Sequence, residues 1–96
     1  LENKKVKILV VDDEQFTRDI FCRQLSKKFS VDEAESAMIA WDKIRNNKYH
    51  IVMTDLVMPG IDGMELLQQI KQEWPEISVV IISGKASIET AVQAMK

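Results

Sequence analysis

Cysteine is almost absent from this sequence of 96 residues. The single thiol, Cys22, has no second thiol with which it could form an internal disulfide or share a zinc ion. A lone thiol of this kind is typical of a protein from a reducing compartment. We therefore expect Cys22 to act as a small packing residue and not as a redox centre.

Long apolar runs and clusters of basic residues are also missing. The apolar run Val79–Ile82 is far too short to cross a bilayer, and the polar start Leu1–Lys5 lacks the apolar segment of a secretion signal. There are 13 Lys and Arg against 15 Asp and Glu, a net charge of -2, and the basic residues are scattered. These features predict a cytoplasmic protein without a membrane segment and without nucleic-acid contacts in this segment.

The composition is that of a globular chain. Hydrophobic residues make up 46% of the sequence and charged residues 29%, which is the balance of a protein that folds in water. The length fits one compact domain and leaves no room for a second core of ordinary size. Because no internal repeat or linker divides the chain, residues 1–96 are expected to form a single domain.

Two periodicities alternate along the chain and predict its architecture. Short segments rich in β-branched residues, typical of strands buried on both faces of a parallel sheet, lie at Lys7–Val11, Ile51–Thr54 and Ile77–Ser83, with a weaker candidate at Ser30–Ala34. Between the strands, apolar residues repeat at helical spacing at Ala37, Ala40, Trp41 and Ile44, and again at Leu66, Leu67, Ile70 and Trp74. The alternation predicts a doubly wound α/β fold, in which right-handed crossovers place helices on both faces of the sheet.

Several other side chains have ordinary structural interpretations. Trp41, Trp74 and Met64 lie at helical spacing and are expected to be packing residues and not cofactor contacts. His50 precedes a strand without a partner at ligand spacing, so we expect it at the surface or in a turn. Asp62 is expected to cap the helix that follows it.

Polar side chains close three of the predicted strands. Asp12 and Asp13 follow the first strand, Asp55 follows Ile51–Thr54, and Ser83 ends the last strand. Asp13 alone could simply cap the next helix, but the carboxyl ends of parallel strands meet at one edge of a sheet, where such folds bind ligands. Carboxylates brought together there repel one another unless a cation intervenes. Oxygen ligands without His or Cys favour magnesium or manganese.

Three stretches resemble the signatures of bacterial two-component response-regulator receiver domains: Val10–Glu14 (VVDDE), Asp55–Gly63 (DLVMPGIDG) and Ile81–Gly84 (IISG). The resemblance implies a flavodoxin-like receiver fold with the strand order 2-1-3-4. It implies a phosphorelay module that is not an enzyme in the ordinary sense, because it catalyses only its own phosphorylation and dephosphorylation. The implied partners are a sensor histidine kinase or phosphotransfer protein and an output domain, attached or separate, which could regulate transcription.

The resemblance also implies a role for each site residue. Asp55 is the phosphoacceptor, and Asp12 and Asp13 organise Mg2+ together with the backbone carbonyl of Val57. The hydroxyl of Ser83 then moves toward the acyl phosphate. The chemistry of the residues agrees, because in-line transfer to a carboxylate mainly needs positioning and neutralised oxygens, which a bound cation supplies. We expect Asp13 to bind the metal directly and Asp12 mainly through water, although the sequence allows either order.

The end of the sequence departs from the family pattern. A receiver domain has a fifth strand and a fifth helix, whereas residue 96 falls within the predicted fourth helix, whose apolar stripe is Ile88, Ala91, Val92 and Met95. We therefore expect a receiver domain that is incomplete at its C-terminus. The uncovered strand edge and apolar face could support a homodimer.

Two other function classes remain open at this point. A haloacid-dehalogenase-type phosphatase also uses an aspartyl nucleophile, but its pattern is D-x-D, whereas Asp12 and Asp13 are adjacent. A flavodoxin-like binding or dimerisation module would need a phosphate-cradling loop after the first strand, where these two acids would repel a phosphate. Acyl-phosphate labelling would separate the three classes.

Overall fold

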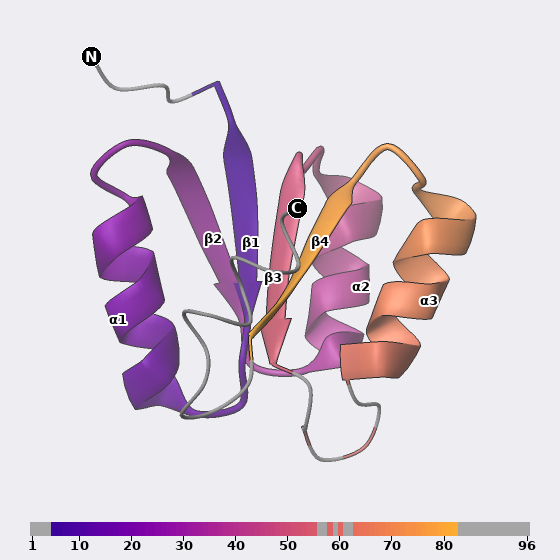
Figure 1. The fold of residues 1–96 in the computed structure, drawn as a ribbon, viewed down its shortest axis with the longest axis horizontal. Helices are drawn as coiled ribbons and strands as arrows, with labels where there is room; N and C mark the ends of the chain where they lie inside the picture. The colour runs from indigo at the N-terminus through magenta and orange to yellow at the C-terminus, as the bar shows by residue number, and fades with distance from the viewer. Residues whose placement is uncertain (1–4, 56–57, 59, 61–62, 83–96) are drawn as a thin grey trace.

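The computed structural model describes residues 5–55, 58, 60 and 63–82. Strands and helices alternate in this part of the chain: β1 (Lys7–Val11), α1 (Gln15–Leu25), β2 (Ser30–Ala34), α2 (Ala37–Asn46), β3 (Ile51–Asp55), α3 (Gly63–Glu73) and β4 (Ser78–Ile82). The strands are all parallel and lie in one sheet in the order β2-β1-β3-β4 (Figure 1). The predicted doubly wound fold and its strand order are confirmed.

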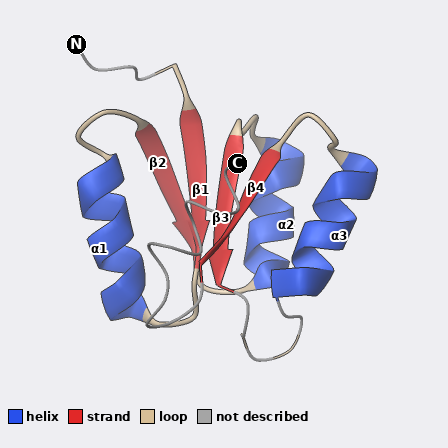
Figure 2. Cartoon of the chain, viewed as in Figure 1, coloured by secondary structure: helices blue, strands red, loops and turns tan. Residues whose placement is uncertain are grey.

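The direction in which the chain adds strands across the sheet reverses at β1. The chain passes from β1 through α1 to β2 on one side, and then through α2 to β3 on the other side of β1. Right-handed crossovers in opposite directions put their helices on opposite faces of the sheet. Figure 2 shows α1 beside β2 at one edge, and α2 and α3 together on the other side of the sheet. The carboxyl ends of β1 and β3 are therefore adjacent at the point where the order reverses, which is where doubly wound sheets form their sites.

A hydrophobic core cluster lies between the sheet and the two helices α2 and α3. Its fully buried members come from alternate strand positions and from one stripe of each helix: Leu9, Val11, Val52, Ala40, Leu66 and Ile70. Trp41 and Trp74 pack against this cluster while partly exposed, so their predicted packing role is confirmed. This core fixes the two central strands and, with them, the residues that follow each strand.

Met64 does not pack as predicted, because 44% of it is exposed. It lies two residues before Leu66, and two residues correspond to about 200° around an α-helix. The stripe defined by Leu66 and Ile70 therefore faces the core while Met64 points away from it. The apolar character of Met64 was misleading, since one exposed apolar side chain is normal on a protein surface.

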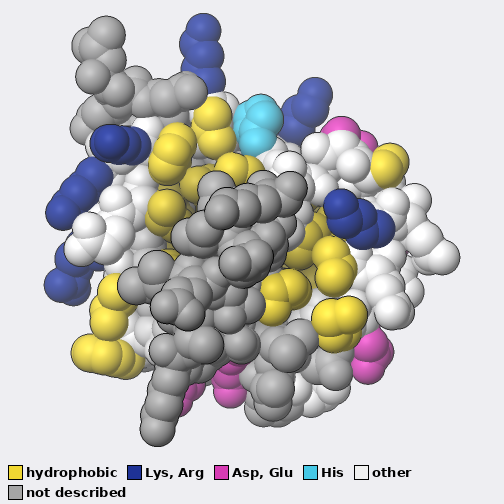
Figure 3. All heavy atoms as spheres, in the orientation of Figure 1, with side chains coloured by type: hydrophobic (Ala, Val, Ile, Leu, Met, Phe, Trp, Pro, Cys, Tyr) yellow, Lys and Arg dark blue, Asp and Glu magenta, His cyan; other side chains and the backbone are white. Residues whose placement is uncertain are grey.

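The helix α1 is covered less well than its neighbours. It contains no fully buried residue, and Cys22 on it is half-buried. Phe16 is 77% exposed and Ile20, one turn later, is 46% exposed. Figure 3 shows apolar side chains at the surface on the side of the molecule where α1 lies. Within the described residues, no helix has both the length and the apolar character that crossing a membrane requires.

The element boundaries depart from the predictions by one residue in several places. The predicted β4 began at Ile77, but the backbone N–H of Ile77 donates to the Trp74 carbonyl at 3.0 Å and so belongs to the preceding turn. The helix α3 ends at Glu73, although Trp74 still donates its N–H to the Ile70 carbonyl at 2.7 Å, and Pro75 follows. The predicted helix cap at Asp62 and the predicted fourth helix lie outside the described residues.

Candidate functional site

Three carboxylates meet at the carboxyl edge of the sheet. Asp12 and Asp13 follow β1, and Asp55 is the last residue of β3, which pairs directly with β1. One carboxylate oxygen from each of the three residues lies within 4.8 Å of the other two. We call Asp12, Asp13 and Asp55 the acid cluster. The parallel pairing of two strands thus brings together side chains that are more than 40 positions apart in the sequence.

The three acids differ in their exposure to solvent. Asp12 is only 3% exposed, Asp13 is exposed and Asp55 is half-buried. Burial raises the pKa of Asp12 above its ordinary value, and a hydrogen bond from the backbone N–H of Glu14 partly offsets this effect. Repulsion from Asp55, Asp13 and Glu14 raises the pKa of Asp12 further. The charged form of Asp12 is therefore disfavoured at this position, and a bound cation would relieve that cost.

Asp12 is fixed by local hydrogen bonds. Its Oδ1 accepts from the backbone N–H of Glu14 at 2.9 Å, and its own N–H donates to the Ala34 carbonyl at the end of β2 at 3.1 Å. One carboxylate oxygen is thus used in the turn that leads into α1, and the other is free of any hydrogen bond within the described residues. The N-cap residue of α1 is Glu14 and not Asp13. Capping therefore does not account for the position of Asp13.

The donor set fits a hard divalent cation. The acid cluster offers only oxygen ligands, which Mg2+, Mn2+ and Ca2+ prefer, and it contains no His or Cys for a softer metal. Magnesium typically binds through one or two carboxylates and keeps waters for its other positions, so three acids are sufficient. The carbonyl of Val57 and the hydroxyl of Ser83 lie outside the described residues.

A glycine with a left-handed backbone conformation lies between β3 and α3. Gly60 has a φ of 80°, in the left-handed region that favours glycine, and no neighbouring atom would meet a side chain there. Two residues earlier, Met58 is 6% exposed and belongs to the core. The backbone conformation of Gly60, and not a lack of space, accounts for glycine at this position in the loop that follows Asp55.

One residue beside the site was missed by the sequence analysis. The Arg18 guanidinium donates from Nη1 to the backbone carbonyl of Asp12 at 2.8 Å, and its Nε lies 2.6 Å from a carboxylate oxygen of Glu33 on β2. The only available signal was an arginine one turn after the start of α1, which looks like any surface cation. His50, by contrast, is exposed as predicted, and its Nδ1 accepts from the backbone N–H of Lys7 at 3.0 Å.

Comparison with known proteins decides the family. The protein-family model named response regulator receiver domain matches residues 8–96 of this sequence. This chain belongs to the response-regulator receiver domain family. Receiver domains of this family act in two-component phosphorelay signalling. The family assignment argues against a haloacid-dehalogenase-type phosphatase and against a flavodoxin-like binding module.

Similar proteins include several response regulators. The hydrogenase transcriptional regulatory protein HoxA of Cupriavidus necator is 33% identical over 92 residues, which cover 96% of this chain and 19% of HoxA. The structure of NtrX from Brucella abortus in complex with ADP superimposes with a TM-score of 0.79 at 40% identity, over 93% of this chain and 21% of NtrX. The response regulator TrrA from Thermotoga maritima, solved in complex with Mg2+–BeF, gives a TM-score of 0.78 at 27% identity, over 93% of this chain and 80% of TrrA. The chain thus spans about a fifth of the length of HoxA and NtrX.

Proposed function

We propose that the chain receives a phosphoryl group on Asp55 from a sensor histidine kinase or phosphotransfer protein, in the presence of Mg2+. The observation that carries this proposal is the convergence of Asp12, Asp13 and Asp55 at the carboxyl edge of the sheet. Asp55 is the half-buried member of the cluster and ends a strand that is paired on both sides, which suits a nucleophile that must be held in line with the donor. The complex of the relative TrrA with Mg2+–BeF supports the choice of this metal.

Each acid has a distinct part in the proposal. Asp13, which is exposed, would bind Mg2+ directly, whereas Asp12, which is buried and already bonded to Glu14, would reach it mainly through water. An oxygen of Asp55 and the backbone carbonyl of Val57 would complete the protein ligands. When bound, Mg2+ neutralises charge on the phosphoryl oxygens, and this lowers the barrier to attack by a carboxylate.

The transfer is a single displacement at phosphorus. A carboxylate oxygen of Asp55 forms the new P–O bond while the N–P bond of a phosphohistidine donor breaks, and the leaving imidazole nitrogen keeps the electron pair. The phosphorylated side chain of Asp55 then carries additional acceptor oxygens at the end of β3. The Ser83 hydroxyl then donates a hydrogen bond to one of these oxygens, which biases a two-state equilibrium that an output domain reads.

Phosphorylation of Asp55 would control transcription, and the protein would act in the cytoplasm. HoxA is a transcriptional regulatory protein, and the receiver-like segment makes up only 19% of its length. An output domain attached to this chain, or a separate partner, would respond to the phosphorylated state. Apart from its own phosphorylation and dephosphorylation, the domain would catalyse no reaction.

Acyl-phosphate labelling tests the proposal directly. The protein is incubated with acetyl phosphate and Mg2+, and should gain one phosphate that hydroxylamine removes, as measured by mass spectrometry. Asp55→Asn should abolish the labelling, whereas Asp42→Asn, an exposed acid on α2, should leave it intact. A phosphate on Ser83, or labelling retained in Asp55→Asn, would contradict the mechanism.

A further inference from the structure

The Arg18 side chain connects Asp12 of the acid cluster to the edge strand β2. Its side chain is 11% exposed although it lies on α1, the least buried helix of the described fold. Nη1 donates to the carbonyl of Asp12 at 2.8 Å, and Nε pairs with Glu33 at 2.6 Å. One guanidinium thus joins the turn after β1 to a residue of β2. The hydrogen bond to Glu33 also raises the pKa of Arg18, so this side chain stays charged.

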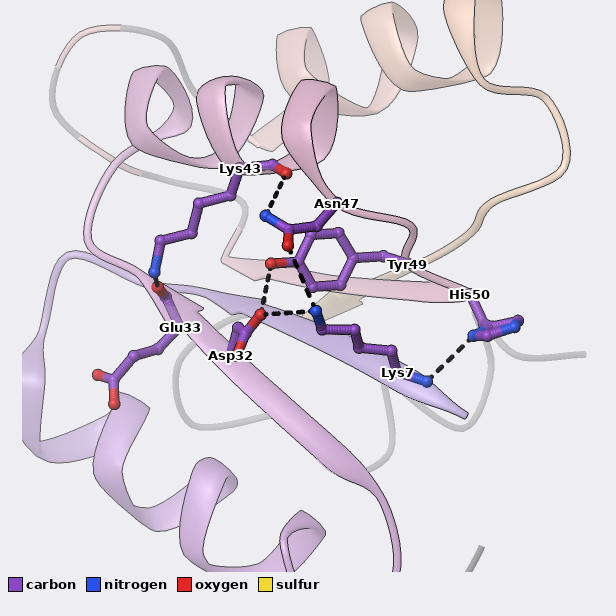
Figure 4. A network of polar contacts seen from close by, with 7 residues as sticks. All are labelled: Lys7, Asp32, Glu33, Lys43, Asn47, Tyr49 and His50. Atoms are coloured by element: carbon purple, nitrogen blue, oxygen red, sulfur yellow. Dashed lines mark hydrogen bonds and ion pairs between the residues drawn. The ribbon is translucent and has the colours of Figure 1, made fainter. Parts of the chain in front are cut away.

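The backbone of Asp12 is held on both sides. Its N–H donates to the Ala34 carbonyl at 3.1 Å, and its carbonyl accepts from Arg18. Both contacts lead to the end of β2, since Glu33 and Ala34 are neighbours. The Nζ of Lys43 on α2 donates in turn to the Glu33 carbonyl, so β2 is fixed from the opposite helix (Figure 4).

We propose that Arg18 is a positioning residue for the cation site, which holds the Asp12–Asp13 backbone so that its carboxylates converge with Asp55. This inference rests on the proposed function. Asp13 is exposed and directly follows the fixed peptide of Asp12, so its direction depends on how that peptide is held. Partners that orient metal ligands without touching the metal commonly change metal affinity by about 10–100-fold.

Two features distinguish a positioning role of Arg18 from an effect of its charge on Mg2+ affinity. A cation near the site repels Mg2+, so loss of the Arg18 charge alone would leave Mg2+ affinity unchanged or increase it. Loss of positioning would weaken binding. In addition, the contacts use Nε and Nη1 together, a planar fork that the single ammonium of a lysine does not reproduce.

The experiment compares Arg18→Gln, Arg18→Lys and Arg23→Gln in the full chain. Arg23 is an exposed arginine on the same helix and provides the matched control for loss of charge. Calorimetric titration with MgCl2 should show about tenfold weaker binding for Arg18→Gln and little rescue by Arg18→Lys, while Arg23→Gln binds as the parent does. In the metal-free protein, amide exchange at Asp12 should become faster in both Arg18 variants.

Unchanged or tighter Mg2+ binding by a folded Arg18→Gln protein would overturn the inference. If that variant does not fold, Glu33→Ala decides, because it removes the anchor and leaves Arg18 in place: weaker Mg2+ binding supports positioning, and unchanged binding overturns it. Failure of the proposed function gives a different result. In that case the parent protein itself would bind no Mg2+ or would not label on Asp55.

Discussion

The Tyr49 hydroxyl donates a hydrogen bond of 2.6 Å to Oδ2 of Asp32, which joins the segment before β3 to the edge strand β2. Tyr49 is 3% exposed, and the Nζ of Lys7 lies 3.4 Å from the same Asp32 oxygen and 5.1 Å from the centre of the tyrosine ring (Figure 4). These three residues come from different segments and none belongs to the acid cluster. Changes here should therefore alter stability without altering the site.

Tyr49→Phe should lower the free energy of unfolding by about 1–2 kcal/mol, because it removes a hydrogen bond to a carboxylate while keeping the buried ring. Urea denaturation followed by circular dichroism measures the loss. Asp42→Asn, an exposed substitution on α2 that leaves this contact in place, serves as the control. A Tyr49→Phe protein as stable as the parent would show that water replaces the hydroxyl at no cost.

The same contact predicts a dependence on pH. The hydrogen bond from Tyr49, followed by the charge of Lys7, lowers the pKa of Asp32 below its ordinary value. A carboxylate with a lowered pKa stabilises the fold above its unfolded pKa, and this stabilisation disappears as the pH falls through the folded value. The parent should therefore lose more stability between about pH 5 and pH 3 than Asp32→Asn does. Parallel acid-induced slopes in the two proteins would contradict this assignment.

Asp12 carries the opposite shift. Burial raises its pKa, so the charged form destabilises the fold, and this cost appears as the pH rises through the unfolded and then the folded pKa. In metal-free protein at neutral pH, Asp12→Asn should therefore raise stability, by roughly 0.5–2 kcal/mol, since Asn keeps the Oδ1 acceptor for Glu14. Asp42→Asn should be neutral in thermal melting experiments. A destabilised Asp12→Asn protein would mean that burial of this charge is compensated within the fold.

Removal of the exposed acid tests the metal assignment. Asp13→Asn should weaken Mg2+ binding by at least about tenfold, because a direct ligand would lose its charge, whereas Asp42→Asn should not change it. Calorimetry or tryptophan fluorescence can follow the titration. Equal affinity in the two variants would show that the metal does not bind at Asp13.

Cys22 should react slowly. Burial, and after it the charge of Glu33, raises the pKa of this thiol to about 11, from an ordinary value of 9.0. At neutral pH this higher pKa leaves about a hundredfold less thiolate, which is the nucleophilic form. Alkylation by iodoacetamide at neutral pH should therefore be slower in folded protein than in urea, although by less than this factor, because a thiolate of higher pKa is also more nucleophilic. Equal rates would indicate an accessible, ordinary thiol.

Local patterns predicted the central strands and the helices α2 and α3 well because each of these elements buries its own apolar stripe, whereas α1 has no fully buried residue. The weak candidate Ser30–Ala34 is a strand with the predicted bounds, and the acids converge because strand ends must meet in a parallel sheet. Long-range polar contacts were not predictable. Nothing in the sequence pairs Tyr49 with Asp32 or Arg18 with Glu33, since these partners meet only when separate elements pack. The roles of Val57 and Ser83, and a homodimer, stay predictions.

The hydrogen bond between the Glu14 N–H and Oδ1 of Asp12 has a consequence for ion selectivity. An Asp12 carboxylate that keeps this hydrogen bond presents mainly its other oxygen to an ion or to a water bound to that ion. Ca2+ often relies on bidentate carboxylates to fill six to eight positions, whereas Mg2+ accepts single oxygens and fills its octahedron with water. In a cluster that holds a cation, the turn that begins α1 would disfavour bidentate binding by Asp12, and this suits the smaller ion better than Ca2+.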